Sequence, residues 1–400
     1  MTRLLEHQSL DLVGAAGLRV APYRVADSPA AATAAAQALG GDTVVKALVP
    51  VGRRGKAGAV RRARSAEEAG DAAGALLGSR VGQFPVQQVL VQAAVDIRDE
   101  YFVAFTYDSG TRGPVVLFSR AGGIDIEDLV RERPEALTVH PLEPGRPLEG
   151  GVAREVAEAG GLAGERAEAA AQALAGLHRV FEDDAFLVEV NPLAVDAAGA
   201  LVVPSAVVVL DDQAEFRHPE WSAFADVGGD GGRPRTDLER RMREIDATDP
   251  GSAIRFNEFP EGRIACMLTG GGSGLVCLDH LQRLGEMPAT TFDITPGRVE
   301  EKMYLATKAI LGRPGLQGFI AGGNITNFIP IDVKVRGVVR ALKELGVDAR
   351  RFPVVFRYAG PGVEVARELA AEVPGIDFYD ERTSLEDAVE RIVTRVRAGA

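Results

Sequence analysis

The sequence predicts an α/β protein with two domains, the second built on a doubly wound parallel sheet. From about residue 261 onward, β-rich runs alternate strictly with helical segments, the pattern of a parallel sheet covered by helices. Before residue 225, the later β-rich runs come in antiparallel pairs joined by turns. The Gly-rich polar stretch 227–236 lies between the two patterns and predicts a linker.

The elements expected before the linker follow from local pattern. The run at 86–95 is apolar at too many positions to be half-exposed, so it is expected to be a buried strand. Turn-forming residues separate the two strands of each antiparallel pair. In order, we expect a helix at 28–39, a strand at 42–49, a helix at 65–78, the strand at 86–95, the pair YFVAFTYD and PVVLFSR, a helix at 151–183, and the hairpin AFLVEVNPLAV and ALVVPSAVVVL.

After the linker, five strands are expected, each followed by a helical segment. They are RIACMLT, TTFDI, GFIAGG, VVFRYA and IDFYD. Ligands of an open parallel sheet bind at the carboxyl ends of its strands. Three loops at those ends are rich in glycine, TGGGSG, AGGNITN and YAGPG, and we expect the ligand site there.

Composition excludes several classes of partner. The net charge of −12 disfavours non-specific binding to nucleic acid or to anionic membranes. No run approaches the roughly 20 apolar residues of a membrane helix, and the N-terminus lacks the pattern of a signal peptide. Cys266 and Cys277 form no disulfide framework or zinc motif, and both are expected to pack in the core. A reducing cytoplasm is the expected compartment.

Two motifs in the first half indicate a phosphate site and a metal site. Lys46 lies inside an apolar strand, where an ammonium needs a partner. The loop Gly52-Arg53-Arg54-Gly55-Lys56 then places three cations beside two glycines, which suits phosphate, although a solvated basic turn has the same composition. Glu189 and Asn191 lie two apart in a strand, so both face one way and offer oxygen ligands to Mg²⁺.

The glycine-rich loops of the second half suggest anion binding. Four glycines precede a helix in TGGGSG, which indicates either an anion site at a helix N-terminus or a plain tight turn. In the next two loops, Asn324, Thr326, Asn327 and Arg357 are candidates to hold a carboxylate. Arg357 is the strongest of them, because guanidinium pairs bidentately with carboxylate. No histidine has metal or nucleophile spacing.

Taken together, these motifs resemble one family along nearly the whole chain. VVKALVPVGRRGKAG, LVQAAVDIRDEYFVAF, SRAGGIDIEDL, VEVNPL, FRHPEW, TGGGSG and RGVVRALKELGV occur in the order of the β subunit of succinyl-CoA synthetase and the N-terminal part of ATP-citrate lyase. IAGGNITNFIPIDVKVRGVVRAL and FRYAGPG are more similar to ATP-citrate lyase. The resemblance implies an ATP-grasp domain over 1–225, a linker over 226–258 and a flavodoxin-like domain over 259–400.

The resemblance also implies an activity and its residues. The activity is that of an NTP-dependent acid–thiol ligase, which joins a di- or tricarboxylic acid to CoA and uses ATP or GTP with Mg²⁺. The reaction is expected to pass through a phosphohistidine and an acyl phosphate. The phosphohistidine and most of the CoA site are expected on an α-type partner subunit. By position, the family's phosphate contacts correspond to Lys46, Arg54 and Gly55, with Arg53 in the same loop. Its ribose- or base-side acid corresponds to Glu100, and one metal ligand corresponds to Asn191. The loop that faces the phosphohistidine corresponds to Gly271, Gly272 and Ser273, and the acid-binding loop corresponds to Gly322, Gly323 and Asn327.

Three positions depart from the family pattern. Gln92 replaces a glutamate on the adenine side, and the second metal ligand, an aspartate in the family, falls at Pro204-Ser205. Asp196, Asp211 and Asp212 are candidates to replace it, although they align poorly. Tyr358 replaces the second of two arginines found in ATP-citrate lyase.

These departures leave a second interpretation open, a catalytically degenerate scaffold or regulatory subunit of a CoA-ligase complex. A third, an ATP-grasp ligase that joins a carboxylate to an amine, does not account for the second domain.

Overall fold

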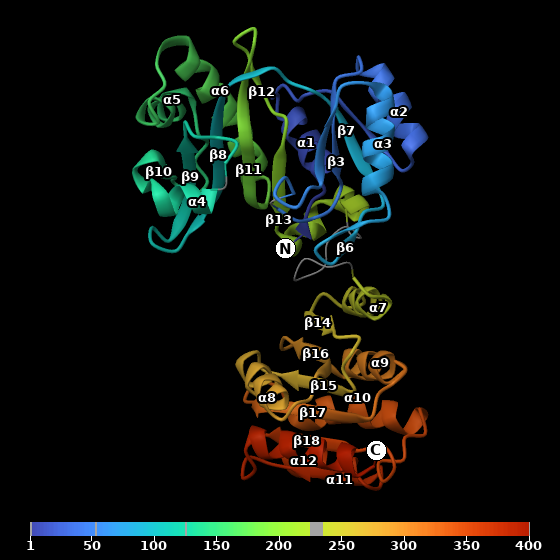
Figure 1. Ribbon diagram of the computed structural model, residues 1–400. Coiled ribbons are helices and arrows are strands. Elements are labelled where there is room, and N and C mark those ends of the chain that lie inside the picture. Colours follow the sequence, from blue (N-terminus) through green and yellow to red (C-terminus); the bar gives the residue numbers. More distant parts are fainter. Residues whose placement is uncertain (1, 53, 125, 225–234, 400) are drawn as a thin grey trace. The chain divides into compact units, whose positions relative to one another are not determined.

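The chain folds into two compact units, Met1–Pro234 and Arg235–Ala400 (Figure 1). The computed structural model describes residues 2–52, 54–124, 126–224 and 235–399. Within these ranges, none of the helices has the length and apolar character that a membrane span requires.

The first unit contains a seven-stranded antiparallel sheet. Its central strands, β8 and β11, place Tyr101, Val103 and Phe105 on the face that packs against the Ala-rich helix α6, because alternate residues of a strand face opposite sides. The other face of the same strands carries Glu100 and Ala194. The sheet runs β1 (Thr2–Arg3), β13 (Ala206–Leu210), β11 (Ala185–Asp196), β8 (Ile97–Asp108), β9 (Gly113–Ser119) and β10 (Thr138–Pro141), with β12 (Leu201–Val202) paired to β11.

The predicted helix over 151–183 is two helices, α5 (Gly150–Ala159) and α6 (Gly164–Glu182). The break falls at Gly160 and Gly161. Gly161 adopts a φ of 87°, and a Cβ at Gly160 would lie 2.2 Å from the ring of Phe118. Glycine is therefore needed there for close packing on the sheet and for the left-handed turn. The part of the unit that contains the seven-stranded sheet also has the helical elements α1 (Glu6–Ala15), α4 (Ile126–Glu132), η1 (Pro134–Ala136), η2 (Asp212–Arg217) and η3 (Pro219–Phe224).

A separate four-stranded antiparallel sheet carries the predicted phosphate-binding lysine. Its core is small and built largely from alanine and valine, with two short helices packed on one face (Figure 1). Ser28 and Ser65 cap these helices by accepting hydrogen bonds from backbone N–H groups. The order is β2 (Tyr23–Ala26), β7 (Val89–Ala93), β3 (Thr43–Ala47) and β4 (Val60–Ala63), with α2 (Pro29–Ala38), α3 (Ala66–Leu76) and the ribbon of β5 (Arg80–Val81) and β6 (Phe84–Pro85).

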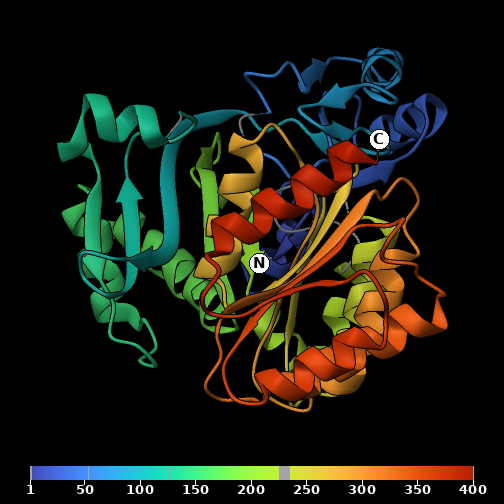
Figure 2. The same ribbon diagram turned by 90° about the horizontal axis from the view of Figure 1, so that it is seen from below.

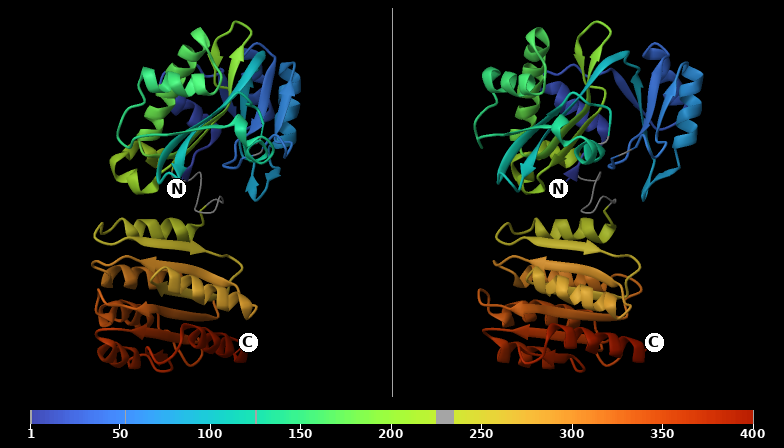
Figure 3. Two further views of the ribbon diagram at one scale, coloured as in Figure 1. Left: turned by 90° about the vertical axis from the view of Figure 1, so that its left-hand side faces the viewer. Right: turned by 60° about the vertical axis from the view of Figure 1, so that its left-hand side comes forward.

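The second unit is a six-stranded sheet whose five predicted strands run parallel (Figure 3). Strand order changes direction at β15 (Ile264–Thr269), because β16 pairs on one side of it and β17 on the other. The loops after β15 and β17 therefore lie next to each other, where ligands of such sheets bind. The remaining strands are β14 (Ile254–Glu258), β16 (Pro288–Ile294), β17 (Gly318–Ile325), β18 (Val354–Ala359) and β19 (Asp377–Tyr379).

Helices cover both faces of this sheet (Figure 2). On one face, α8 and α12 pack over Cys266, Ile320 and Val355. On the other, four helices pack over Met267, Ala321 and Phe356. The first pair is α8 (Gly272–Arg283) and α12 (Leu385–Ala398), and the second set is α7 (Asp237–Asp246), α9 (Glu300–Leu311), α10 (Ile331–Glu344) and α11 (Val363–Ala371). Cys266 and Cys277 are buried and free, as predicted.

The predicted linker over 226–258 is too long. Residues 225–234 lie outside the described residues, but α7 and β14 fold with the second unit. Thr236 and Glu239 form a capping box at the start of α7, and β14 pairs antiparallel with β16 at the edge of the sheet. The polar sequence of both elements resembles a linker because each is exposed on one side.

Candidate functional site

Lys46 bridges the two sheets of the first unit. It lies on β3 of the four-stranded sheet, and its ammonium is buried. All three of its N–H donors have an oxygen acceptor, so the partner that the sequence required is present. The Nζ atom donates to Glu6 Oε1 at 2.9 Å, to Gln92 Oε1 at 2.8 Å and to the carbonyl of Pro204 at 2.8 Å.

The carboxylate of Glu6 joins Lys46 to the basic loop. Arg54 Nη1 lies 2.6 Å from Glu6 Oε2 and donates to the carbonyl of Ala47 at 3.2 Å. Burial alone would raise the pKa of Glu6, but Lys46 and Arg54 outweigh burial and lower it to about 2. The cluster therefore contains two cations and one anion, which leaves one positive charge in excess.

A further cation, Arg3, lies beside this cluster. A Cβ at Gly52 would lie 3.5 Å from Arg3 Nη2, so the guanidinium borders the basic loop. Burial lowers the pKa of Arg3, while the charge of Glu189 opposes this effect. Arg3 and Glu6 could not be predicted from the sequence, because nothing in the TRLLE segment indicates contact with residues 40 or more positions away.

The rest of the predicted phosphate loop is more open. Gly55 is exposed, and Arg53 lies outside the described residues. The ammonium of Lys56 lies 2.9 Å from Asp128 Oδ2 on α4. The loop therefore contacts a helix from the part of the unit that contains the seven-stranded sheet. The structure thus groups Lys46 and Arg54 with buried partners and leaves Gly55 accessible to solvent.

Asn191 and Glu100 both contact one glycine loop. Asn191 Oδ1 accepts from the N–H of Gly123 at 2.7 Å, and its Nδ2 donates to the carbonyl of Ile124 at 2.9 Å. A Cβ at Gly123 would lie 2.1 Å from Glu100 Oε2, so the Glu100 carboxylate lies directly against the same residue. The carboxylate expected on the ribose or base side is therefore close to the predicted metal ligand.

The proposed replacements for the missing metal aspartate are too far away. Val190 pairs with Ala206, and one further step along the ladder places Ser205 opposite Asn191. Asp211 follows the end of β13, about 20 Å further along at roughly 3.3 Å per residue. Asp196 is occupied in its turn, where it accepts from the N–H groups of Ala198 and Ala200 at 2.9 Å. Asp212 directly follows Asp211 and is equally distant.

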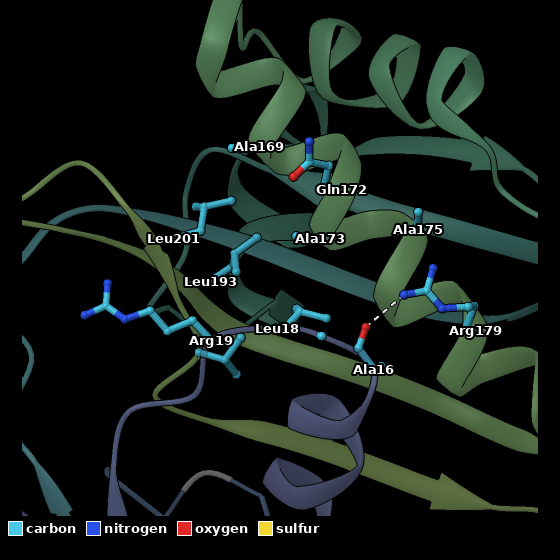
Figure 4. Close-up of a pocket in the computed structure, with 12 residues that line it drawn as sticks. Ala16, Leu18, Arg19, Ala169, Gln172, Ala173, Ala175, Arg179, Leu193 and Leu201 are labelled. Atoms are coloured by element: carbon cyan, nitrogen blue, oxygen red, sulfur yellow. Dashed lines mark hydrogen bonds between the residues drawn. The ribbon is translucent and has the colours of Figure 1, made fainter.

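A cavity of the first unit lies away from this polar site (Figure 4). It measures about 510 Å³ and lies between α6 and the hairpin of β11 and β12. Arg179 Nη2 closes one end by donating to the carbonyl of Ala16 at 2.8 Å (Figure 4). Leu193 and Leu201 line it on the α6 face of the sheet, opposite the face of Glu100. This cavity therefore does not mark the polar site.

In the second unit, the loop before α8 already binds a carboxylate. Gly270 and Gly271 have positive φ values of 100° and 44°. Their N–H groups donate to Asp293 Oδ1 at 2.8 Å and Oδ2 at 3.3 Å. Ser273 does not point to an external ligand, because its hydroxyl donates to the carbonyl of Thr269 at 2.9 Å. The exposed Gly272 begins α8, and a cavity of about 320 Å³ borders the loop.

Gly322 and Gly323 are glycines for a packing reason. A Cβ at either position would lie 1.9 Å from a carbonyl oxygen of a neighbouring strand, that of Arg357 or Thr269. Asn324 extends over Gly270, where a Cβ would lie 2.5 Å from Asn324 Oδ1. Asn327 is exposed. The structure thus brings Asn324 to the α8 loop and accounts for the two glycines by strand contact.

Arg357 is buried at the end of β18 and is partly occupied. Its Nη1 donates to the carbonyl of Gly323 at 2.8 Å, and its Nε donates to the carbonyl of Thr383 at 3.1 Å. These bonds fix the guanidinium and leave mainly Nη2 for a ligand. The bidentate carboxylate contact expected of Arg357 would need one of these backbone bonds to open.

Comparison with known proteins assigns the family. An ATP-grasp domain model matches residues 3–195. The β subunit of GDP-forming succinate–CoA ligase from Thermus thermophilus is 35% identical over 401 residues, which cover 99% of this chain and 100% of that protein. The chain belongs to the succinate–CoA ligase β-subunit family. The ADP-forming β subunit of Chloroflexus aurantiacus is also 35% identical, over 92% of this chain and 93% of that protein.

Solved structures agree at the level of the fold. ATP citrate lyase from Methanothrix soehngenii superimposes with a TM-score of 0.80 at 21% identity, over 98% of this chain and 99% of that chain. The predicted ATP-grasp fold followed by a flavodoxin-like parallel sheet is thereby confirmed. As a member of the succinate–CoA ligase β-subunit family, the chain is a subunit of a nucleoside-diphosphate-forming CoA ligase.

Two departures from the family pattern have clear local effects. The amide of Gln92 accepts from Lys46 and donates through Nε2 to the carbonyl of Ala21 at 3.1 Å, a donor that a carboxylate would lack. Tyr358 is buried on the face covered by α9, α10 and α11. Burial raises the pKa of Tyr358, and its hydroxyl has no hydrogen-bond partner among the described residues.

Proposed function

We propose that the first unit binds ATP or GTP with Mg²⁺ and drives ligation of a small di- or tricarboxylic acid to CoA, together with an α-type partner subunit. The observation that carries this proposal is the cluster of Lys46 and Arg54 around Glu6, with Arg3 beside it. Its excess positive charge adjoins a glycine-containing loop, which suits a polyphosphate. The relatives' names supply the reaction class, and two unpaired cysteines are compatible with a reducing cytoplasm.

The residues near Asn191 are suited to Mg²⁺. A magnesium ion bound to nucleotide takes most of its ligands from phosphates and water and needs one or two protein oxygens. Asn191 supplies an amide oxygen beside Gly123, and Ser205 is adjacent through the strand register. The carboxylate of Glu100 lies against the same Gly123, so we propose that it supplies a metal oxygen in place of the ribose- or base-side contact expected from the resemblance. The described residues contain no group of three or more His, Cys, Asp or Glu side chains placed to hold a metal alone. Bound Mg²⁺ would neutralise phosphate charge.

Phosphoryl transfer explains why a carboxylic acid becomes reactive. The terminal phosphoryl group passes from the nucleotide to a histidine of the partner, which releases the nucleoside diphosphate. It then passes to an oxygen of the acid, and the CoA sulfur attacks the resulting acyl phosphate and expels phosphate. The loop at Gly271 and Gly272 and the candidate acid-binding residues of the second unit would position the last two steps. The partner supplies the histidine and most of the CoA site.

The test is transfer of label from γ-³²P-ATP or GTP to the partner. With Mg²⁺ and this chain present, we expect acid-labile, base-stable label on a partner histidine, and no label when the chain is omitted. Asn191→Ala should lower labelling, while Asp42→Asn, on an exposed ion pair of the four-stranded sheet, should not. An unlabelled partner in a stable complex would contradict the proposal.

One observation favours the alternative of a degenerate scaffold. All three donors of Lys46 are occupied by protein oxygens, so a phosphate must displace the Pro204 carbonyl or another partner to reach it. A scaffold would keep this arrangement when Mg²⁺ and nucleotide are added. Nucleotide binding that is weak and independent of Mg²⁺, measured by calorimetry on the purified chain, would support the scaffold.

A further inference from the structure

The second unit contains two buried lysines with contrasting surroundings. Lys302 on α9 is 1% exposed and Lys334 on α10 is 4% exposed. Lys302 Nζ lies 2.8 Å from the carboxylate of Asp246 and also donates to the carbonyl of Ser252. These contacts tie α9 to the last residue of α7 and to the segment that follows it, which is a structural role.

Lys334 lacks such a pair. Its Nζ makes one hydrogen bond, to Thr269 Oγ1 at 3.2 Å, and no carboxylate of the described residues lies within ion-pair distance. An ammonium carries three donors, and leaving a buried charge under-satisfied is costly. Burial lowers the pKa of Lys334, and the charge of Asp293 only partly opposes this. The carboxylate of Asp293 is directed instead to the N–H groups of Gly270 and Gly271.

Lys334 lies at the carboxyl ends of β15 and β17, the edge of a parallel sheet where ligands bind. Thr269 is the last residue of β15, and it pairs with Gly323 near the end of β17. Thr269 is buried, whereas the next residue, Gly270, is exposed, so the ammonium lies just beneath the surface loop. Tyr358, whose hydroxyl is also buried without a partner, lies on the same face of the sheet as Thr269, the face covered by α10.

We propose that Lys334 binds the carboxylate of the substrate acid that is not activated, an inference that rests on the proposed function. The deeper carboxylate meets the ammonium, while the carboxylate to be phosphorylated stays at the exposed glycine loop, where a partner histidine can reach it. A monocarboxylic acid cannot occupy both places. The substrate class is therefore an acid with at least two carboxylates, and Lys334 selects it.

Matched variants of the two buried lysines test this assignment. Lys334→Met and Lys302→Met each replace an ammonium by an apolar side chain of similar length in the full-length chain. We would measure the melting temperature of each variant with and without succinate, citrate, malate and the monocarboxylate butyrate. Affinity for each acid would be measured by calorimetry. Nucleotide binding with Mg²⁺ in the same samples reports the proposed function separately, because it depends on the first unit.

The expected results differ for the two lysines. Lys334→Met should melt no lower than wild type, because no ion pair is lost, and should bind di- and tricarboxylates at least tenfold more weakly. Lys334→Arg should retain part of the affinity. Lys302→Met should melt lower but bind acids as the wild type does. The proposal is overturned if Lys334→Met binds these acids normally, if it is destabilised like Lys302→Met, if butyrate binds wild type equally well, or if no acid binds wild type.

Discussion

Replacing Glu6 by glutamine would test whether the buried charge cluster of the first unit holds its two sheets together. Glu6 is the only carboxylate shown within ion-pair distance of both Lys46 and Arg54 among the described residues. The two cations lower the pKa of Glu6 from its ordinary value of 4.5 to about 2. At 1.36 kcal/mol per pKa unit, the cluster favours the ionised form by about 3 kcal/mol. Removing one partner of a buried pair commonly costs about 3–5 kcal/mol, so we expect a loss of about 3 kcal/mol.

The same shift fixes the pH dependence. The pKa of Glu6 is lower in the folded than in the unfolded chain, so its stabilisation is fully present above about pH 4.5. It is lost as the pH falls toward about 2, where the folded form also becomes protonated. The Glu6→Gln variant should lack this contribution to acid sensitivity. Its free energy of unfolding should therefore differ less between pH 7 and pH 3 than that of the wild type.

The chain's single tryptophan allows the first unit to be measured by itself. Trp221 is the only tryptophan, is buried in the main core of the first unit and stacks on His218 at 4.0 Å. Urea unfolding followed by its fluorescence gives the stability of this unit. Asp42→Asn, which breaks the exposed pair with Arg62, is the control and should change little. Equal urea midpoints for Glu6→Gln and wild type would refute the reasoning.

Two further substitutions test individual contacts of the candidate nucleotide site. Gln92→Glu removes the donor to the Ala21 carbonyl and should destabilise the first unit by about 1–3 kcal/mol. Urea unfolding followed by Trp221 fluorescence measures this loss, and unchanged stability would contradict the assigned bond. Gly123→Ala places a Cβ 2.1 Å from Glu100 Oε2 and should weaken Mg²⁺-dependent nucleotide binding in calorimetry. Gly145→Ala has the same positive φ but open space around it, so equal affinities of the two variants would argue against Glu100 at the metal.

The fold of the second unit could be predicted because each parallel strand is a continuous apolar run. The five expected strands correspond to β15 through β19. The edge strand β14 was not predicted. An antiparallel edge strand needs only one buried face, so IRFNE alternates between apolar and polar residues and forms no continuous apolar run. The break between α5 and α6 was also missed. It depends on contact between Gly160 and Phe118, which sequence periodicity does not contain.

The candidate sites were predictable only in part. An apolar strand around Lys46 indicated that a partner must exist, but Glu6 and Pro204 are 40 and 158 residues away, so pattern could not identify them. Lys334 gave no signal, because lysine on an amphipathic helix is ordinarily exposed. Its burial depends on the depth at which α10 packs against the end of β15.

The most direct test of the central claim is loss of CoA thiol with this chain, its α-type partner, Mg²⁺ and ATP or GTP. Succinate, citrate, malate and butyrate would be supplied one at a time. The account predicts thiol loss with one di- or tricarboxylic acid, dependent on nucleotide and absent with butyrate. A stable complex that consumes no thiol with any acid would contradict an active ligase and would identify the chain as a scaffold.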